Sequence, residues 1–145
     1  MDYESFNQII VAHRNSIIFI GISVLIFVII GIVAVEIYVR GNLNFQYIKF
    51  NKLKFSPTLL MLIPLILVIV YFPIKIYQCN YDIDNLSYES YVGEVEYSES
   101  SVKLVDDKLS VFVGKYHEIV PRGITYGLVI YSEKSHVIVF YEAQN

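Results

Sequence analysis

The chain has 145 residues, a length typical of one domain, and 55% of them are hydrophobic, above the ~45–50% typical of soluble domains. The formal net charge of −3 argues against general nucleic-acid binding, because proteins of that class usually carry a basic face. The charge is also uneven, since residues 80–145 hold 11 acidic and 5 basic side chains, a net of −6, whereas the first 79 residues hold 3 acidic and 6 basic, a net of +3.

A transmembrane helix is predicted over 17–40, after an N-terminal flank at 1–16. The stretch 17–35 reads IIFIGISVLIFVIIGIVAV and carries no charge. A helix of that length spans about 28 Å, close to the ~30 Å hydrocarbon thickness of a bilayer. Glu36 and Arg40 close the span four residues apart and are expected at the membrane interface. A cleaved signal peptide is disfavoured, because the run exceeds an h-region of ~7–15 residues and no positively charged region precedes it.

The connecting loop, 41–56, mixes aromatic and aliphatic side chains with three lysines, Lys49, Lys52 and Lys54. This composition suits the headgroup layer of an anionic leaflet, and a docking strip for a protein partner is the alternative interpretation.

A second transmembrane helix is predicted over 57–78, where the run 55–74 carries no charge. Pro57 fits the first helical turn, Pro64 is expected to kink the helix, and Lys75 can extend to the interface. Lysine and arginine are more numerous in the loop than in the flanks, so the positive-inside rule places the loop in the cytoplasm. Both termini then lie outside the cytoplasm, and an integral protein of the plasma or inner membrane is expected.

Residues 79–87 are predicted to form a linker, because the segment YDIDNL is rich in turn-forming Asp and Asn. Its first residue, Cys79, is the one cysteine of the chain and therefore has no intramolecular disulfide partner. A small residue near the membrane surface is the simplest interpretation, with an intermolecular disulfide or lipidation as alternatives.

A β domain is predicted over 88–145, where the apolar pattern changes to a period of two. Strands are expected at 91–97, 102–105, 109–113, 124–131 and 136–141, with an irregular strand at 116–120. With no helix signal in this part, the pattern favours a small antiparallel barrel or sandwich, SH3-like or OB-like, in which Gly93, Gly114 and Gly127 permit bends. The predicted fold is a two-helix transmembrane hairpin followed by this all-β domain.

The sequence gives little support for chemistry at a catalytic or metal site. The three histidines, His13, His117 and His136, are not at metal-ligand spacing with another histidine, cysteine or carboxylate. A G-x-S-x-G nucleophile motif and a phosphate-binding glycine loop are both absent from the sequence. The chain is therefore expected to be non-enzymatic and to bind neither metal nor cofactor.

Five carboxylates are expected to gather near one end of the first β-hairpins: Glu94, Glu96, Glu99, Asp106 and Asp107. A docking surface for a basic protein partner is the functional interpretation, and an ordinary solvated face is the alternative.

These features favour a small, bacterial-looking membrane protein that acts by protein–protein binding. An immunity or inhibitor protein against a membrane-acting toxin is the leading hypothesis. An accessory subunit of a larger secretion, conjugation or transport complex is the alternative. The expected partners are membrane lipid and a protein, with no nucleic acid.

Overall fold

The computed structural model describes residues 3–41, 48–50, 53–55, 57–98, 101–113 and 123–144. The chain divides into two compact units. We call residues 17–74 the apolar unit, and residues 1–16 together with 75–145 the sheet unit.

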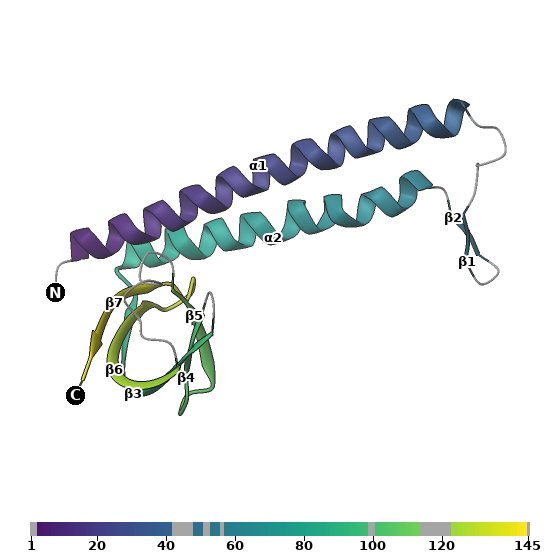
Figure 1. Cartoon of the computed structure of the whole chain (residues 1–145). Coiled ribbons are helices and arrows are strands. Elements are labelled where there is room, and N and C mark those ends of the chain that lie inside the picture. Colours follow the sequence, from purple (N-terminus) through teal and green to yellow (C-terminus); the bar gives the residue numbers. More distant parts are fainter. Residues whose placement is uncertain are drawn as a thin grey trace. The chain divides into compact units, whose positions relative to one another are not determined.

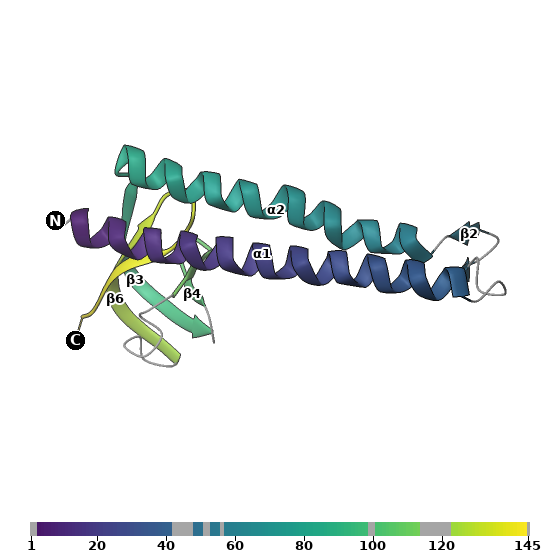
Figure 2. The same cartoon turned by 90° about the horizontal axis from the view of Figure 1, so that it is seen from above.

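The apolar unit contains most of two long helices, α1 (Tyr3–Gly41) and α2 (Pro57–Asn85), which run side by side (Figure 1, Figure 2). Gly21 of α1 lies against the ring of Phe72 of α2, where an added Cβ would come within 3.1 Å of the ring. A glycine at this point therefore lets the two helices approach closely.

Short strands β1 (Ile48–Phe50) and β2 (Leu53–Phe55) form an antiparallel hairpin within the segment predicted as a loop. The triplets IKF and LKF alternate apolar and charged residues, the pattern of a strand.

Most side chains along the two helices face outward. Phe19 is 73% exposed and Phe27 is 75% exposed. The stretches Tyr3–Tyr38 and Leu62–Asn85 are long and apolar enough to cross a membrane, and the most apolar window of each is 0% and 6% buried, respectively. The prediction of two long apolar helices is confirmed.

Both helices are longer than predicted. The flank expected at 1–16 is helical from Tyr3, and α2 continues through most of the segment expected as a linker at 79–87. Leu86 adopts the left-handed conformation with φ of 51°, and the Ser87 N–H donates to the Asp82 carbonyl oxygen at 3.1 Å. This is the geometry of a Schellman C-cap, which glycine usually provides. A leucine in the glycine position explains why the sequence did not indicate the end of this helix.

The sheet unit is built on five antiparallel strands: β3 (Tyr88–Ser98), β4 (Ser101–Leu104), β5 (Leu109–Phe112), β6 (Gly123–Ser132) and β7 (Ile138–Ala143). Their order in the sheet is β5-β4-β3-β6-β7. Each matches a strand predicted from alternation, whereas the irregular strand expected at 116–120 lies outside the described residues. Inward-facing valines dominate the core, among them Val95, Val102, Val111 and Val129, each fully buried.

The two edges of this sheet meet at one point. Phe112, the last residue of β5, forms a parallel bridge with Val137, and its N–H donates to the His136 carbonyl oxygen at 2.7 Å. Figure 1 shows how strongly β3 and β6 curve. The described strands form an open five-stranded antiparallel sheet, so the prediction of an antiparallel β domain is confirmed.

Two glycines face each other across β3 and β6 and make room for tyrosine rings. Gly93 and Gly127 are register partners. A Cβ at Gly93 would lie 2.5 Å from the Tyr91 hydroxyl, and a Cβ at Gly127 would lie 2.9 Å from the Glu142 carbonyl oxygen. A side chain at Gly93 would require the Tyr91 ring to move, and one at Gly127 would require the backbone of β7 to move, as expected for strand glycines at a close approach.

Candidate functional site

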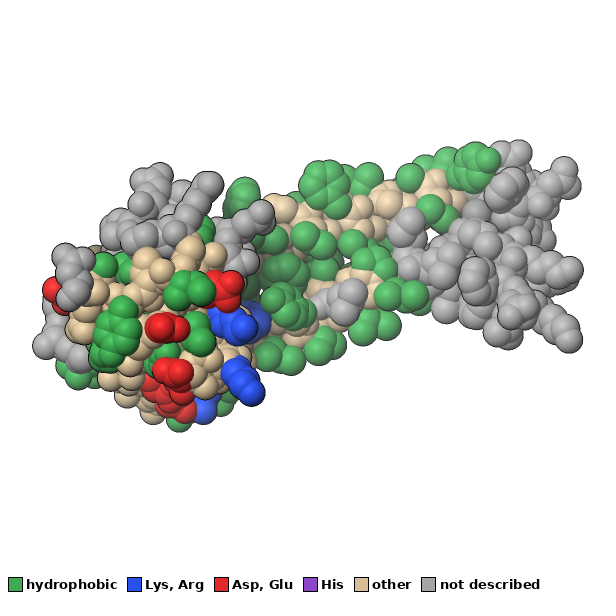
Figure 3. Space-filling model, turned by 60° about the horizontal axis from the view of Figure 1, so that its bottom comes forward, with side chains coloured by type: hydrophobic (Ala, Val, Ile, Leu, Met, Phe, Trp, Pro, Cys, Tyr) green, Lys and Arg blue, Asp and Glu red, His purple; other side chains and the backbone are tan. Residues whose placement is uncertain are grey.

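The strongest candidate for a binding surface is the outer face of the sheet, which we define by Val92, Glu94, Glu96, Ile124 and Tyr126. In the register of β3 with β6, Glu94 is opposite Tyr126 and Glu96 is opposite Ile124. Directly opposed residues lie on the same side of a sheet, so each carboxylate has a large apolar neighbour. Figure 3 shows acidic and hydrophobic side chains next to each other on the sheet unit.

The apolar members of the outer face are open to solvent. Val92 is 52% exposed, Ile124 is 67% exposed and Tyr126 is 50% exposed. Single exposed apolar side chains are ordinary, but a contiguous group bordered by charge is typical of an interaction surface. These apolar residues were not predicted as part of a surface, although the alternation along 124–128 is the signal that could have identified them.

A second pair of predicted carboxylates lies in the turn between β4 and β5. Asp106 and Asp107 are both exposed there. The Tyr91 hydroxyl lies 3.0 Å from the Glu94 carbonyl oxygen and 3.1 Å from Asp106 Oδ2. Burial is the main cause that raises the pKa of Tyr91. The Asp106 carboxylate therefore helps to hold the turn against β3, which leaves Asp107 as the more available carboxylate of the pair.

The predicted acidic cluster is thus brought together only in part. Glu94 and Glu96 share the outer face, and Asp106 is connected to the backbone of Glu94 through Tyr91. Glu99 lies outside the described residues.

A buried carboxylate, which the sequence analysis did not single out, fixes the end of α2 to the turn between β6 and β7. Asp82 is fully buried. Its oxygens accept hydrogen bonds from the Lys134 N–H at 2.9 Å, the Ser135 N–H at 2.7 Å and the Ser135 hydroxyl at 2.6 Å. Ser132 extends the network, with its hydroxyl 2.6 Å from that of Ser135. Multiple donors of this kind stabilise a buried carboxylate, so the network is a structural junction.

The first turns of α1 also pack on the sheet unit. Tyr3, Phe6 and Tyr88 form an aromatic group with ring centroids 5.5 to 6.4 Å apart. The Tyr88 hydroxyl donates to Asn7 Oδ1 at 2.5 Å. Burial, aided by the negative charge of Asp82, raises the pKa of Tyr88 to about 12. These contacts make the N-terminal segment part of the sheet unit rather than a free flank.

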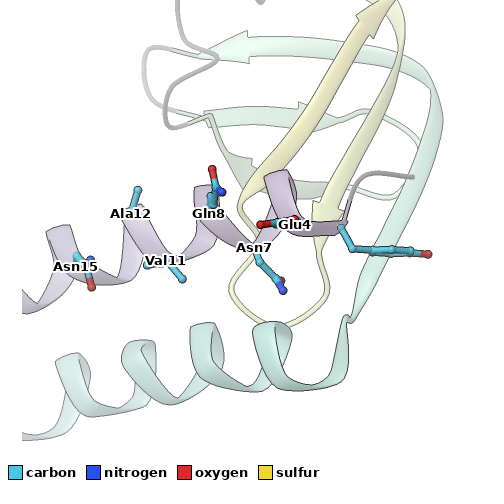
Figure 4. A pocket seen from close by; sticks show the side chains of 7 residues that line it. Glu4, Asn7, Gln8, Val11, Ala12 and Asn15 are labelled. Carbon is cyan, nitrogen blue, oxygen red and sulfur yellow. The ribbon is translucent and has the colours of Figure 1, made fainter.

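A shallow groove follows the first turns of α1. Its lining includes the polar side chains of Glu4, Asn7, Gln8 and Asn15, although most of its surface is apolar. Figure 4 shows that the labelled side chains all project from this one helix. Among the described residues, no three His, Cys, Asp or Glu side chains gather as a metal site, and this groove holds a single carboxylate. The groove therefore offers hydrogen bonding without an acid–base pair.

The predicted membrane-interface residues are distributed over both units. Glu36 and Arg40 lie near the end of α1, and Lys75 lies in the part of α2 that belongs to the sheet unit. Lys49 and Lys54 are register partners in the β1–β2 hairpin, whereas Lys52 lies outside the described residues.

Comparison of the chain with models of protein families, with curated proteins and with solved structures finds no match.

Proposed function

We propose that this chain is a membrane-anchored binding protein, in which two helices hold the protein in a bilayer and the outer face of the sheet binds a basic protein partner. The observation that carries the proposal is the contrast between the units. The apolar windows of the helices are almost entirely exposed, whereas the sheet unit has a buried core of its own. An exposed apolar surface of this size is unfavourable in water, and the hydrocarbon core of a bilayer can surround helices of this length.

The orientation follows from the charges of the chain. Arg40 and the lysines of the segment between the helices outnumber the basic residues of the flanks, which favours a cytoplasmic position for that segment. In this arrangement the sheet unit lies on the opposite side of the membrane.

The proposal includes an OB-like barrel for the sheet unit. The first strand, β3, is long and pairs with both β4 and β6, and the edge strand β5 meets the residue before β7 in a parallel bridge. This pairing order supports an OB-like arrangement, which is a five-stranded and partly open barrel. An SH3-like barrel is the alternative.

The outer face supports a protein partner with basic side chains. Glu94 and Glu96 supply negative charge, and the exposed apolar side chains beside them supply area that a partner can bury. Charge complementarity of this kind mainly sets specificity and the association rate, so binding should weaken as salt is raised. A membrane-acting toxin is the leading candidate for the partner, and the chain would then act as its immunity protein.

Membrane anchoring is tested by washing membranes from expressing cells with alkaline carbonate. The chain should stay in the pellet and dissolve only in detergent. Release by carbonate alone would contradict the anchoring role.

Partner binding is tested by purification in mild detergent through a tag at Asn145, with mass spectrometry of the proteins retained. The double variant Glu94→Lys/Glu96→Lys should lose a partner that the wild type retains. Asp84→Lys is the matched control, because Asp84 is an exposed carboxylate on α2, away from the outer face. Equal retention by the wild type and the double variant would contradict the assignment of the outer face. A toxin among the retained proteins supports the immunity role, and several membrane proteins at fixed ratio would make the chain an accessory subunit instead.

A further inference from the structure

Two cations of the sheet unit lie where the apolar runs of the helices end. Arg14 precedes by three residues the uncharged run that starts at Ile17, and Lys75 directly follows the run that ends at Ile74. Both side chains are half-buried and belong to the same compact unit. In a protein held in a bilayer by these runs, both cations lie at the depth of the lipid headgroups.

The hydrogen bonds of Arg14 are incomplete. Its Nη1 donates to Asn80 Oδ1 at 2.8 Å, which joins α1 to the end of α2. Its Nε is buried and has no hydrogen-bond partner. The guanidinium as a whole is only half-buried, so its exposed part can donate to an oxyanion from outside the protein.

Arg14 and Lys75 lack ion-pair partners in the part of the chain that the structure describes, since neither has a carboxylate within ion-pair distance there. Lys75 lies on α2 five residues before Asn80, the hydrogen-bond partner of Arg14, so both cations lie along the same part of this helix. The Asp82 carboxylate accepts its hydrogen bonds from Lys134 and Ser135, and among the described residues it forms no ion pair with either cation.

Exposed aromatic side chains occur in the same part of the sheet unit as the two cations. Phe112 is 40% exposed and packs against the ring of His13, with the ring centroids 4.7 Å apart. Tyr77, two residues after Lys75, is 68% exposed. Amphipathic aromatic rings beside lysine and arginine are typical of the interface between membrane and water.

We propose that Arg14 and Lys75 form a binding site for the phosphate of an anionic phospholipid, in the leaflet that borders the sheet unit. The site rests on the membrane anchoring proposed above. The lipid phosphate supplies the ion-pair partner that neither cation has among the described residues, and the exposed rings of the same unit lie in the layer of the glycerol and the upper acyl chain. Free phosphate shares the charge but not the apolar part, so the two ligands can be distinguished.

The test uses the full chain in nanodiscs of phosphatidylcholine alone or mixed with phosphatidylglycerol. Native mass spectrometry after release from the discs counts the retained phosphatidylglycerol, and thermal unfolding is followed in parallel. The wild type should retain phosphatidylglycerol and unfold at a higher temperature in the mixed discs. Lys75→Gln should weaken retention about fivefold, the contribution of one lysine at an anionic surface. Arg14→Gln should also weaken it, but this variant also loses the hydrogen bond to Asn80.

Lys108→Gln is the matched control, because Lys108 is an exposed lysine in the turn between β4 and β5. It should retain phosphatidylglycerol as the wild type does. If Lys75→Gln and Lys108→Gln lose retained phosphatidylglycerol equally, the retention depends on general surface charge, and the proposed site is overturned. Equal stabilisation by inorganic phosphate in phosphatidylcholine discs would indicate a free-anion site and overturn the lipid assignment. A chain that resists carbonate extraction yet shows no preference for phosphatidylglycerol contradicts the lipid site alone, whereas a chain released by carbonate contradicts the anchoring itself.

Discussion

The carboxylate of Asp82 accepts hydrogen bonds from both the backbone N–H and the hydroxyl of Ser135, a residue 53 positions further along the chain. These two bonds measure 2.7 and 2.6 Å, and both residues are buried. The contact joins a helix to a β-turn across the sheet unit, so the stability of the unit should depend on it.

Replacing Asp82 by alanine should lower the free energy of unfolding of the sheet unit by about 2–4 kcal/mol, because the Lys134 and Ser135 N–H groups then lose their acceptor in a buried place. Asp82→Asn keeps one acceptor oxygen, so its free energy of unfolding should lie between that of Asp82→Ala and that of the wild type. Chemical denaturation in detergent, followed by tyrosine fluorescence, measures the change. Asp84→Ala, an exposed position two residues away, should stay within about 0.5 kcal/mol of the wild type. Equal effects of Asp82→Ala and Asp84→Ala would show that the junction contributes little.

Cys79 provides an independent measure of the same junction. Its thiol is fully buried and lies one helical turn before Asp82. A maleimide reagent should therefore label the native protein slowly, at a rate limited by opening of the unit. In Asp82→Ala the labelling rate should rise about 30- to 800-fold, which corresponds to the loss of about 2–4 kcal/mol expected for this variant. Rapid labelling of the wild type, at the rate of the denatured chain, would contradict the burial of this thiol.

Alkaline pH should destabilise the sheet unit through its buried tyrosines. Burial, followed by the hydrogen bond to Glu89 at 2.7 Å, raises the pKa of Tyr131, and burial raises the pKa of Tyr88 to about 12. Unfolded tyrosines ionise near pH 10. The folded state therefore holds its phenol protons more tightly, so this part of the stability is complete below about pH 10 and is lost as the pH rises toward the folded pKa values.

Melting temperatures measured between about pH 8 and pH 12 should show this fall, and Tyr131→Phe should make it shallower because one ionisable phenol is removed. Tyr126→Phe, on the exposed outer face, controls for the loss of a hydroxyl as such. An equally steep fall in wild type and Tyr131→Phe would assign the alkaline transition to other groups.

Gly93→Ala should destabilise the sheet by about 1–3 kcal/mol, because the new methyl group would overlap the Tyr91 hydroxyl and displace it from Glu94 and Asp106. Thermal unfolding of the variant in detergent measures this loss. Gly41→Ala is the comparison, since a Cβ at Gly41 has nothing within 4 Å. A stable Gly93→Ala variant would mean that Tyr91 can move at little cost.

Local patterns in the sequence were sufficient for most of the secondary structure. The uncharged apolar runs predicted the two helices, and alternation predicted the strands that the structure describes. The strands expected at 102–105 and 109–113, on either side of Asp106 and Asp107, were also predicted correctly, since they correspond to β4 and β5, which pair directly. Each of these features depends on residues that are near one another in the chain.

The features that were missed depend on distant partners. Asp82 stands in a segment whose composition indicates a turn, yet the segment is helical because its buried carboxylate is held by residues 52 and 53 positions away. The bridge between Phe112 and Val137 likewise joins two strands that are not consecutive. Of the candidate surface, the carboxylates on β3 were predicted, but their apolar neighbours on β6 became apparent only from the register.

The sheet unit is discontinuous in the sequence, since its first segment is residues 1–16 and its second is residues 75–145. During synthesis the ribosome makes the first segment before either apolar run and the second segment after both. Phe6 and Ile10 therefore lack the residues that bury them until the remainder of the unit has been synthesised. The order of biosynthesis thus delays completion of this unit until both helices of the apolar unit have left the ribosome.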